Sequence, residues 1–266
     1  MEANRYLIDH YNRYDEEGRL GTRHGQVEFL TTMHYIKKYA RPDARILEIG
    51  AGTGRYSHAL ARQGYSVDAV ELVEHNIDIF RNHTIPGEKV TILQGNALDL
   101  SAFPDEFYDI TLLLGPMYHL YTQADKRQAI REALRVTHPG GIVFAAYVIS
   151  DGCLIDEGFC RGEIDVAAYI RDGLLDGETF VAHSQPKDLF ELVRKEDIDA
   201  VMEPFNVCRL HYVAADGCAC LLRDAIEKMD EKTFQLYLKY HLATCERDDL
   251  AGITSHALDI FQKRAD

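Results

Sequence analysis

The chain has 266 residues, of which 46% are hydrophobic and 27% charged, with 19 Gly and 7 Pro. This composition is that of a globular protein, and it excludes a collagen, a disordered chain or a disulfide scaffold. The 29 Lys and Arg residues against 43 Asp and Glu residues leave a net charge of −14. A field of that sign repels phosphate backbones and anionic bilayers, so nucleic acid and membrane surfaces are not expected as partners.

The sequence shows no targeting signal. Its N-terminus is polar and mixed in charge, and no run of eighteen apolar residues occurs. A cytoplasmic protein is therefore expected. The six cysteines are too few for a disulfide framework, and Cys218-Ala219-Cys220 lacks a second pair or a histidine cluster, so we expect reduced thiols and no metal. The oligomeric state is left open.

Short apolar runs alternate with helical patterns between residues 45 and 149. The runs predict strands at 45–50, 66–72, 89–95, 108–114 and 141–149, with helices at 56–63, 73–82 and 122–137. This alternation is typical of βαβ units, which build a parallel sheet with helices on both faces.

The alternation of short apolar runs with helical patterns ends after residue 149. An amphipathic stretch at 184–202 reads as helical, strands are expected at 205–214 and 256–264, and Asp230 is placed to cap a helix between them. The simplest organisation is a core of 41–149 plus 203–266, an inserted cap of 150–202 and an N-terminal helical lid of 1–40. The stretch 151–200 holds 13 acidic and 5 basic residues, so most of the net charge belongs to the cap.

The first predicted strand runs into a glycine loop, in the segment ILEIGAGTGRY. Glycines let the backbone turn sharply and approach a ligand, and the following helix supplies free N–H groups. Dinucleotide folds use G-x-G-x-x-G, but the position of that third glycine is taken by Arg55 and the glycine comes one residue early, at Gly54. Glu48, two residues before Gly50, suits a ligand that carries an ammonium and a sulfonium group.

Two more polar positions follow at strand ends. Glu71 closes the second strand, where a carboxylate can accept hydrogen bonds from both ribose hydroxyls. Asn96 follows the third strand, where a side-chain amide can read an adenine edge. A loop, an acid and an amide at successive strand ends together indicate a nucleoside cofactor.

With these motifs the sequence resembles the class I S-adenosylmethionine-dependent methyltransferases, in the small-molecule branch labelled methyltransferase domain 11 or 25. The matching segments are ILEIGAGTGRYSHALARQGYSVDAVEL, GNALDLSAFPDEFYDITLLLGPMYHL and EALRVTHPGGIVFAAYV. The resemblance implies a Rossmann-like, doubly wound, mostly parallel sheet of seven strands, with the last strand antiparallel. It covers about residues 45–149, so it does not reach the lid or the cap.

The resemblance also implies a cofactor-binding set, with S-adenosylmethionine as donor and S-adenosylhomocysteine as product. The glycines of the loop would contact the methionine moiety, Glu71 the ribose, and Asn96-Ala97 the adenine, with Leu114 beneath the sulfonium. Many relatives have Asp where this chain has Asn96, and both residues accept a hydrogen bond. The full set is Glu48, Gly50, Ala51, Gly52, Gly54, Glu71, Leu72, Asn96, Ala97 and Leu114.

Candidate catalytic residues follow the fourth strand. His119 has the ordinary pKa of a general base, and the alternative is that it only orients the loop. Tyr118 either shapes the methyl-transfer channel or packs. The lid offers four further residues that would close over the cofactor, although the tyrosines equally fit a packing stripe and the arginine a solvated surface. They are Tyr11, Tyr14, Arg23 and His24.

The expected activity is methyl transfer to an O, N or S atom of a small molecule. Two alternatives stay open: an NAD(P)-linked oxidoreductase, and a module that binds S-adenosylmethionine without catalysis. The acidic cap favours a neutral or cationic substrate over an acidic one, unless its carboxylates only form a solvated surface. The acids concerned are Asp156, Glu157, Glu163, Asp165, Asp172 and Asp176.

Overall fold

The computed structural model describes residues 2–12 and 21–265. Its strands form one mixed sheet in the order β3-β2-β1-β4-β5-β8-β7, and a short strand, β6, pairs with β5 off this path. The strands are β1 (Arg45–Ile49), β2 (Ser66–Glu71), β3 (Val90–Gln94), β4 (Tyr108–Leu113), β5 (Thr137–Ile149), β6 (Leu192–Val193), β7 (Val207–Ala214) and β8 (His256–Lys263).

The strands predicted from the sequence are all present, and the doubly wound Rossmann-like sheet is confirmed. β5 begins earlier than expected, at Thr137. The last strand, β8, runs antiparallel to both of its neighbours, β5 and β7. Its first residue therefore lies at the edge of the sheet where the parallel strands end.

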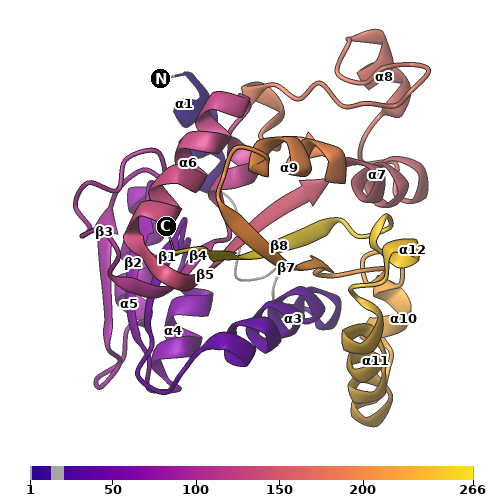
Figure 1. Cartoon of the computed structure of the whole chain (residues 1–266). Helices are drawn as coiled ribbons and strands as arrows, with labels where there is room; N and C mark the ends of the chain where they lie inside the picture. Colours follow the sequence, from indigo (N-terminus) through magenta and orange to yellow (C-terminus); the bar gives the residue numbers. More distant parts are fainter. Residues whose placement is uncertain (1, 13–20, 266) are drawn as a thin grey trace.

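Helices cover both faces of the sheet (Figure 1). They are α1 (Glu2–Tyr11), α3 (Arg23–Tyr39), α4 (Arg55–Ala61), α5 (Glu74–His83), α6 (Gln123–Val136), α7 (Ser150–Cys153), α8 (Val166–Arg171), α9 (Lys195–Met202), α10 (Arg223–Glu227), α11 (Glu231–Thr244) and α12 (Asp248–Ala251). Short 3-10 turns form η1 (Pro116–His119) and η3 (Pro186–Asp188), and a π-helical turn forms η2 (Leu154–Cys160).

Alternation along the strands divides the core into two layers. Leu47 of β1 packs in one cluster with α6 and α9, whereas its neighbour Ile46 packs in another with α3 and α4. In β5, Val143 and Phe144 divide between the same two clusters. Successive side chains of a strand point to opposite faces, so the sheet is buried on both sides. Such a sandwich holds the strand ends rigidly at one edge.

The cap segment differs from its prediction in one respect. The stretch 184–202 is helical only from Lys195, in α9. Pro186 begins a 3-10 turn, Leu189 has a φ of 69°, and Leu192–Val193 pair with β5. A positive φ is costly for a branched residue and does not fit a right-handed helix, so the apolar spacing alone was misleading.

Side chains cap the N-termini of α6 and α11, and the cap at Asp230 is the one predicted from the sequence. Thr122 accepts a hydrogen bond from the Asp125 N–H at the start of α6, and Asp230 accepts one from the Thr233 N–H at the start of α11. These bonds satisfy N–H groups that have no partner within the helix.

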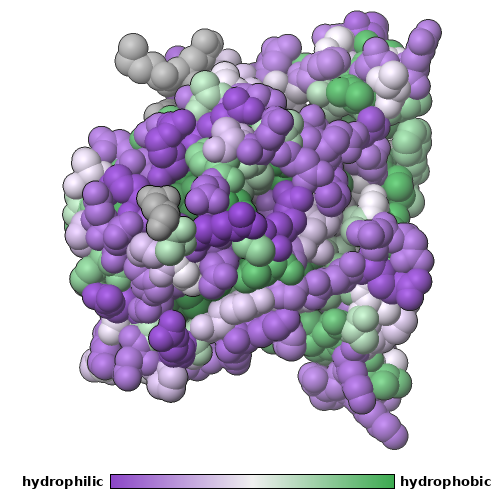
Figure 2. Space-filling model, viewed as in Figure 1, coloured by the Kyte–Doolittle hydropathy of each residue, from purple (hydrophilic) through white to green (hydrophobic). Residues whose placement is uncertain are grey.

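Within the described residues, no helix has both the length and the apolar character needed to cross a bilayer. On the face seen in Figure 2, apolar residues appear as separate areas among hydrophilic ones.

Candidate functional site

A cavity lies at the edge of the sheet where the parallel strands end. The ends of β1 to β4 line one part of it, and α1, α3 and the start of β8 line another. It encloses about 1350 Å³ of empty space, part of which is open to solvent. Of the predicted cofactor set, all residues except Gly54 line this cavity. Open α/β sheets bind ligands at this edge.

The glycine loop follows β1 and folds back toward β4. Gly50 has a φ of 75°, and a Cβ there would lie 2.7 Å from Pro116 Cδ. Gly52 has a φ of 53° with no atom within 4 Å of its Cβ position, so it faces open space in the cavity wall. Position 50 requires glycine for two reasons: its φ is positive, and a Cβ there would come too close to Pro116.

Gly54 corrects the sequence-based expectation. It does not line the cavity. It precedes α4 with a φ of 91°, and a Cβ there would lie 2.4 Å from the Phe80 ring and 2.7 Å from the His58 ring. The third glycine of the motif therefore packs the loop against α5, outside the cavity lining.

Glu71 fixes the glycine loop to the end of β2. Its Oε2 accepts a hydrogen bond from the Gly52 N–H at 2.9 Å, and its Oε1 accepts from the Val73 N–H at 2.9 Å and the Asn76 amide at 3.3 Å. Burial raises the pKa of Glu71, and these hydrogen bonds oppose the rise. The carboxylate is thereby held in a single orientation at the cavity wall.

Glu48 lies in the same wall and is 2% exposed. The Ser57 hydroxyl donates a hydrogen bond to its Oε2. Burial raises the pKa of Glu48 to about 8 despite that bond, so the carboxyl group is poised to ionise when a cation approaches.

Asn96 and Ala97 line the cavity beyond β3. The Asn96 side-chain oxygen accepts a hydrogen bond from the Leu98 N–H at 2.9 Å, which fixes the side chain in a turn. An amide oxygen has two lone pairs, so this oxygen can accept a second hydrogen bond from a ligand. Leu72 and Leu114 add apolar surface to the same wall.

His119 joins the N-terminal helix α1 to the cavity. Its Nδ1 lies 2.9 Å from the Leu189 carbonyl oxygen, and its Nε2 lies 3.0 Å from the Tyr11 hydroxyl. Burial lowers the pKa of His119 to about 4, so the ring is neutral at neutral pH, with its proton on Nδ1. Nε2 then accepts from the Tyr11 hydroxyl, and His119 orients Tyr11 better than it would serve as a base.

The other candidates from the sequence lie in different surroundings. Tyr118 lines the cavity, and its hydroxyl donates to the Leu114 carbonyl at 3.0 Å. Arg23 and His24 correct the expectation, because neither lines the cavity. Arg23 lies 3.4 Å from Glu231 and over the Phe234 ring, and His24 Nδ1 lies 2.8 Å from Glu227. Tyr14 lies outside the described residues.

None of the acidic residues of the cap lines the cavity, since no lining residue comes from within 150–202. Asp156 pairs with Arg223 at 2.7 Å and with Arg161 at 3.3 Å. Asp165 caps α8 by accepting from the Ala168 N–H. Asp156 therefore takes part in local ion pairs, and Asp165 in a helix cap. The cavity takes its acids from elsewhere.

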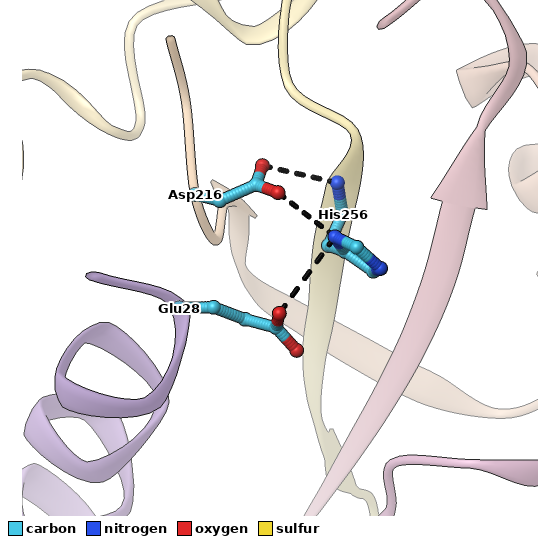
Figure 3. Close-up of side chains that lie close together, drawn as sticks. All are labelled: Glu28, Asp216 and His256. Carbon is cyan, nitrogen blue, oxygen red and sulfur yellow. Dashed lines mark hydrogen bonds and ion pairs between the residues drawn. The ribbon is translucent and has the colours of Figure 1, made fainter. Parts of the chain in front are cut away.

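Three side chains that the sequence analysis missed lie together beside the cavity: Glu28 of α3, Asp216 beyond β7 and His256 at the start of β8 (Figure 3). Glu28 and His256 line the cavity, whereas Asp216 is 2% exposed behind them. Asp216 follows one strand end and His256 opens the next strand. That placement at a common edge was the available signal.

Asp216 holds His256 through two bonds. Its Oδ2 lies 2.8 Å from His256 Nδ1, and its Oδ1 accepts from the His256 N–H at 3.1 Å. Burial would raise the pKa of Asp216, but His256 and the hydrogen bonds hold it at about 2. Glu28 Oε2 lies 3.7 Å from the same Nδ1. Within the described part of the chain, these three form a group whose metal-ligating atoms all lie within 4.8 Å of one another.

Comparison with known proteins agrees with this geometry. Residues 47–145 match the family model described as a methyltransferase domain. Residues 47–145 thus belong to the class I S-adenosylmethionine-dependent methyltransferase domains. The methyl donor of this methyltransferase family is S-adenosylmethionine, and its product is S-adenosylhomocysteine.

Relatives of the chain include two enzymes named for quinone biosynthesis. It is 30% identical over 136 residues to the ubiquinone biosynthesis O-methyltransferase of Hydrogenovibrio crunogenus, covering 49% of this chain and 53% of that protein. It is 35% identical over 109 residues to the ubiquinone/menaquinone biosynthesis C-methyltransferase of Vibrio parahaemolyticus, covering 38% and 40%. The chain thus spans about half the length, or less, of these two relatives.

Among solved structures, phosphoethanolamine N-methyltransferase 1 of Haemonchus contortus matches with a TM-score of 0.62 at 10% identity. The match covers 100% of this chain and 49% of that one. At that identity the likeness shows the fold alone.

The residues of the cavity fit this cofactor. S-adenosylmethionine carries an ammonium and a sulfonium, and the cavity wall contains the buried carboxyls Glu48 and Glu71. Arg55, where a dinucleotide fold has its third glycine, lies with its guanidinium 4.7 Å from the centre of the Phe29 ring. A pyrophosphate would meet the two acids, whereas a cationic ligand is attracted by them.

Proposed function

We infer that the protein transfers the methyl group of S-adenosylmethionine to a protic O, N or S atom of a small molecule. The observation that carries this proposal is the continuity of the cavity: the cofactor wall at Glu48, Glu71 and Asn96 and the polar side chains Tyr11 and His256 line the same space. When bound, the cofactor supplies an activated methyl group. The protein then has to bind, align and exclude water.

Each cofactor residue has a proposed role. The Glu48 carboxylate would hold the ammonium, Glu71 would accept from the ribose hydroxyls, and Asn96 would accept from the adenine amine. The burial of Glu48 and the single orientation of Glu71 support these roles, because fixed groups lose little entropy when the ligand binds.

Tyr11 and His119 are proposed to close the acceptor side. The Tyr11 hydroxyl is held by His119 Nε2, and α1 also contacts η3. This arrangement brings an N-terminal helix over the cavity and reduces the access of water, which strengthens polar contacts inside it.

The acceptor is proposed to be neutral or cationic. The acids Glu28, Glu48 and Glu71 line the cavity, and the guanidinium of Arg55 is partly turned to the Phe29 ring. A carboxylate or phosphate acceptor would therefore meet a net negative wall.

Calorimetric titration with S-adenosylmethionine and with NAD tests the cofactor part of the proposal. We expect binding of the first and none of the second. Incubation with methyl-labelled cofactor and a panel of phenols, thiols and amines then tests transfer. Tight NAD binding without S-adenosylmethionine binding would favour an oxidoreductase, and cofactor binding without any labelled product would favour a non-catalytic module.

A matched pair of variants tests the closing role of Tyr11. Tyr11→Phe removes the hydroxyl that His119 holds, whereas Tyr6→Phe changes a residue of the same helix that is 40% exposed. We expect about a tenfold loss of kcat/KM in the first, as for a lost hydrogen bond, and no change in the second.

A further inference from the structure

Two histidines reach the cavity, and the structure treats them differently. His119 is buried, with its Nδ1 on the Leu189 carbonyl and its Nε2 on the Tyr11 hydroxyl. His256 is bound on its Nδ1 side by Asp216, with Glu28 beside it. A ring held on Nδ1 by an ionised carboxylate has its lone pair on Nε2, which is the arrangement of a positioned proton acceptor.

Figure 3 shows how the ring is set. Both carboxylates lie on the Nδ1 side, and Nε2 lies on the side of the ring that faces away from them. The backbone also fixes the residue: the Ala215 N–H donates to the His256 carbonyl at 2.8 Å, and β8 pairs with β5 from this residue onward. The imidazole is therefore mounted on the rigid edge of the sheet, where acceptor-side residues of the cavity meet.

The hydrogen bonds of Asp216 favour this assignment over a metal site. Its Oδ1 accepts from the Thr254 hydroxyl, the Ser255 N–H and the His256 N–H, and its Oδ2 accepts from His256 Nδ1 and the Cys220 thiol. A metal ion on these oxygens and on Nδ1 would have to displace several donors from a buried carboxylate. The hydrogen bonds around Asp216 thus favour its role as the acceptor for the ring N–H of His256.

We propose that His256 is the general base of the methyl transfer, with Asp216 as its positioning residue and Glu28 as a second anion that stabilises the imidazolium. This proposal rests on the function proposed above. In the step, the acceptor atom forms a bond to the methyl carbon as the carbon–sulfur bond breaks. The electron pair of that bond returns to sulfur, giving S-adenosylhomocysteine, and the acceptor's proton passes to Nε2 of His256, from which water later removes it.

The substrate class follows from this chemistry. A base is useful only when the acceptor atom bears a proton that must leave, as in a phenol, a thiol or a protonated amine. The resulting imidazolium has two carboxylates on its Nδ1 side, so the positive charge that forms on the ring is balanced within the site. The acceptor is accordingly inferred to be a protic nucleophile.

Other titratable groups surround the ring and enter its pH behaviour. Glu157 of η2 interacts with His256 electrostatically, and Cys220 and His241 interact with Asp216. Substitutions for the test are therefore kept to His256 and Glu28, which leave the buried acceptor set of Asp216 intact.

The first measurement is the tautomer of His256 in the full chain with S-adenosylhomocysteine bound. Long-range ¹H–¹⁵N NMR spectra distinguish the two ring nitrogens, and His256→Gln assigns the signals. We expect the neutral ring to bear its proton on Nδ1. A neutral ring with its proton on Nε2 would overturn the proposal, because that nitrogen would have no lone pair to accept a proton.

The second measurement is turnover with whichever acceptor of the panel is labelled. His256→Gln is expected to lower kcat about 10²–10⁴-fold and to remove the rise of kcat/KM with pH, while the dissociation constant of S-adenosylmethionine stays within about twofold. The control is His211→Gln, which alters a histidine 2.7 Å from Glu246, outside the cavity wall. A loss of kcat below about tenfold in His256→Gln overturns the proposal.

Two outcomes are kept apart by design. If no acceptor in the panel is labelled, the proposed function fails, and the tautomer measurement still decides the state of His256. Titration with Zn²⁺ alone tests whether the three residues form a metal site instead. Stoichiometric zinc binding that is lost in both His256→Gln and Glu28→Gln would overturn the base assignment in favour of a metal site.

Discussion

The two halves of the cavity are built in different ways. We call the part at the ends of β1, β2 and β3 the cofactor half, after its proposed ligand. Its glycine loop and its polar residues at three successive strand ends come from one segment of the chain, residues 48–97. Backbone groups do much of the work there, as when the Gly52 N–H binds Glu71. We call the other part the acceptor half, because the acceptor is proposed to bind there. Its side chains come from α1, α3, η1 and β8, which are far apart in the sequence.

This difference explains what each half can tolerate. A backbone loop at the edge of a buried sheet has little freedom, so its geometry is specified by a few glycines and by the strand it follows. Side chains assembled from distant elements can change one at a time without disturbing the fold. Substitutions in the cofactor half are accordingly expected to reduce stability or cofactor affinity, whereas those in the acceptor half are expected to change turnover and leave the fold intact.

Gly54→Ala should have the largest effect. The new Cβ would lie 2.4 Å from the Phe80 ring, and the residue would keep a φ of 91°. Backbone strain and overpacking together predict a loss of about 2–5 kcal/mol in the free energy of unfolding, measured by urea titration. The control is Gly64→Ala, with a φ of 97° and no atom within 4 Å, which should lose only about 1–2 kcal/mol. Equal losses in the two variants would mean that packing at Gly54 contributes nothing.

Glu71→Gln tests how much a single side chain of the cofactor half contributes to cofactor affinity. One oxygen becomes an NH₂ group that faces the N–H of Gly52 or Val73, so a donor meets a donor. We expect S-adenosylmethionine affinity to fall about 10–100-fold by calorimetry, the cost of one or two mispaired buried groups. Glu74→Gln, at an exposed position in the first turn of α5, is the control. Unchanged affinity in Glu71→Gln would remove Glu71 from the proposed ribose site.

The same contrast explains what the sequence predicts. The glycine loop, Glu71 and Asn96 are close in sequence and lie at strand ends, so hydrophobic periodicity and motif spacing are enough to place them together. Gly54 is the exception. A glycine needed for packing against Phe80 cannot be told by sequence from one needed for a ligand.

The acceptor half lacked such signals. Asp216 follows the strand predicted at 205–214, and His256 begins the strand predicted at 256–264. Their proximity depends on β7 and β8 pairing as antiparallel neighbours, which is a long-range property of the sheet. Glu28 reaches them from α3, a helix near the other end of the chain. Lys195 marks a similar limit, since the helix that begins there is shorter than its apolar pattern.

Glu48→Gln is expected to alter how stability depends on pH. Burial raises the pKa of Glu48 from 4.5 to about 8, so the folded chain holds a proton there that the unfolded chain releases. This contribution is fully present below the unfolded pKa and is lost as the pH rises through the folded pKa of about 8. Urea unfolding from about pH 5 to about pH 8 should show the native chain losing about 3 kcal/mol relative to Glu48→Gln.

Ser57→Ala sharpens that measurement. The Ser57 hydroxyl stabilises the ionised carboxylate, so its removal should shift the loss of stability to higher pH. If the native chain and Glu48→Gln show the same pH dependence, Glu48 is not protonated in the folded state over that pH range. In that case its pairing with an ammonium group would need no proton release.

Neutralising the exposed acids of the cap should have the smallest effect. Glu163 and Asp172 have side chains that are 57% and 54% exposed, and each pairs with a neighbouring arginine. S-adenosylmethionine has a positive sulfur and S-adenosylhomocysteine does not, so the ratio of their dissociation constants reports the electrostatic field at the sulfur. In the double variant Glu163→Gln, Asp172→Asn this ratio should stay within about twofold of the native value, because water and salt screen exposed charges beyond about 8 Å. In Glu48→Gln it should change severalfold when measured above about pH 8, where Glu48 is ionised, because Glu48 lines the cavity and is 2% exposed. A larger change in the cap variant than in Glu48→Gln would show that the net charge of −14 acts on the ligand through the cap rather than through the cavity wall.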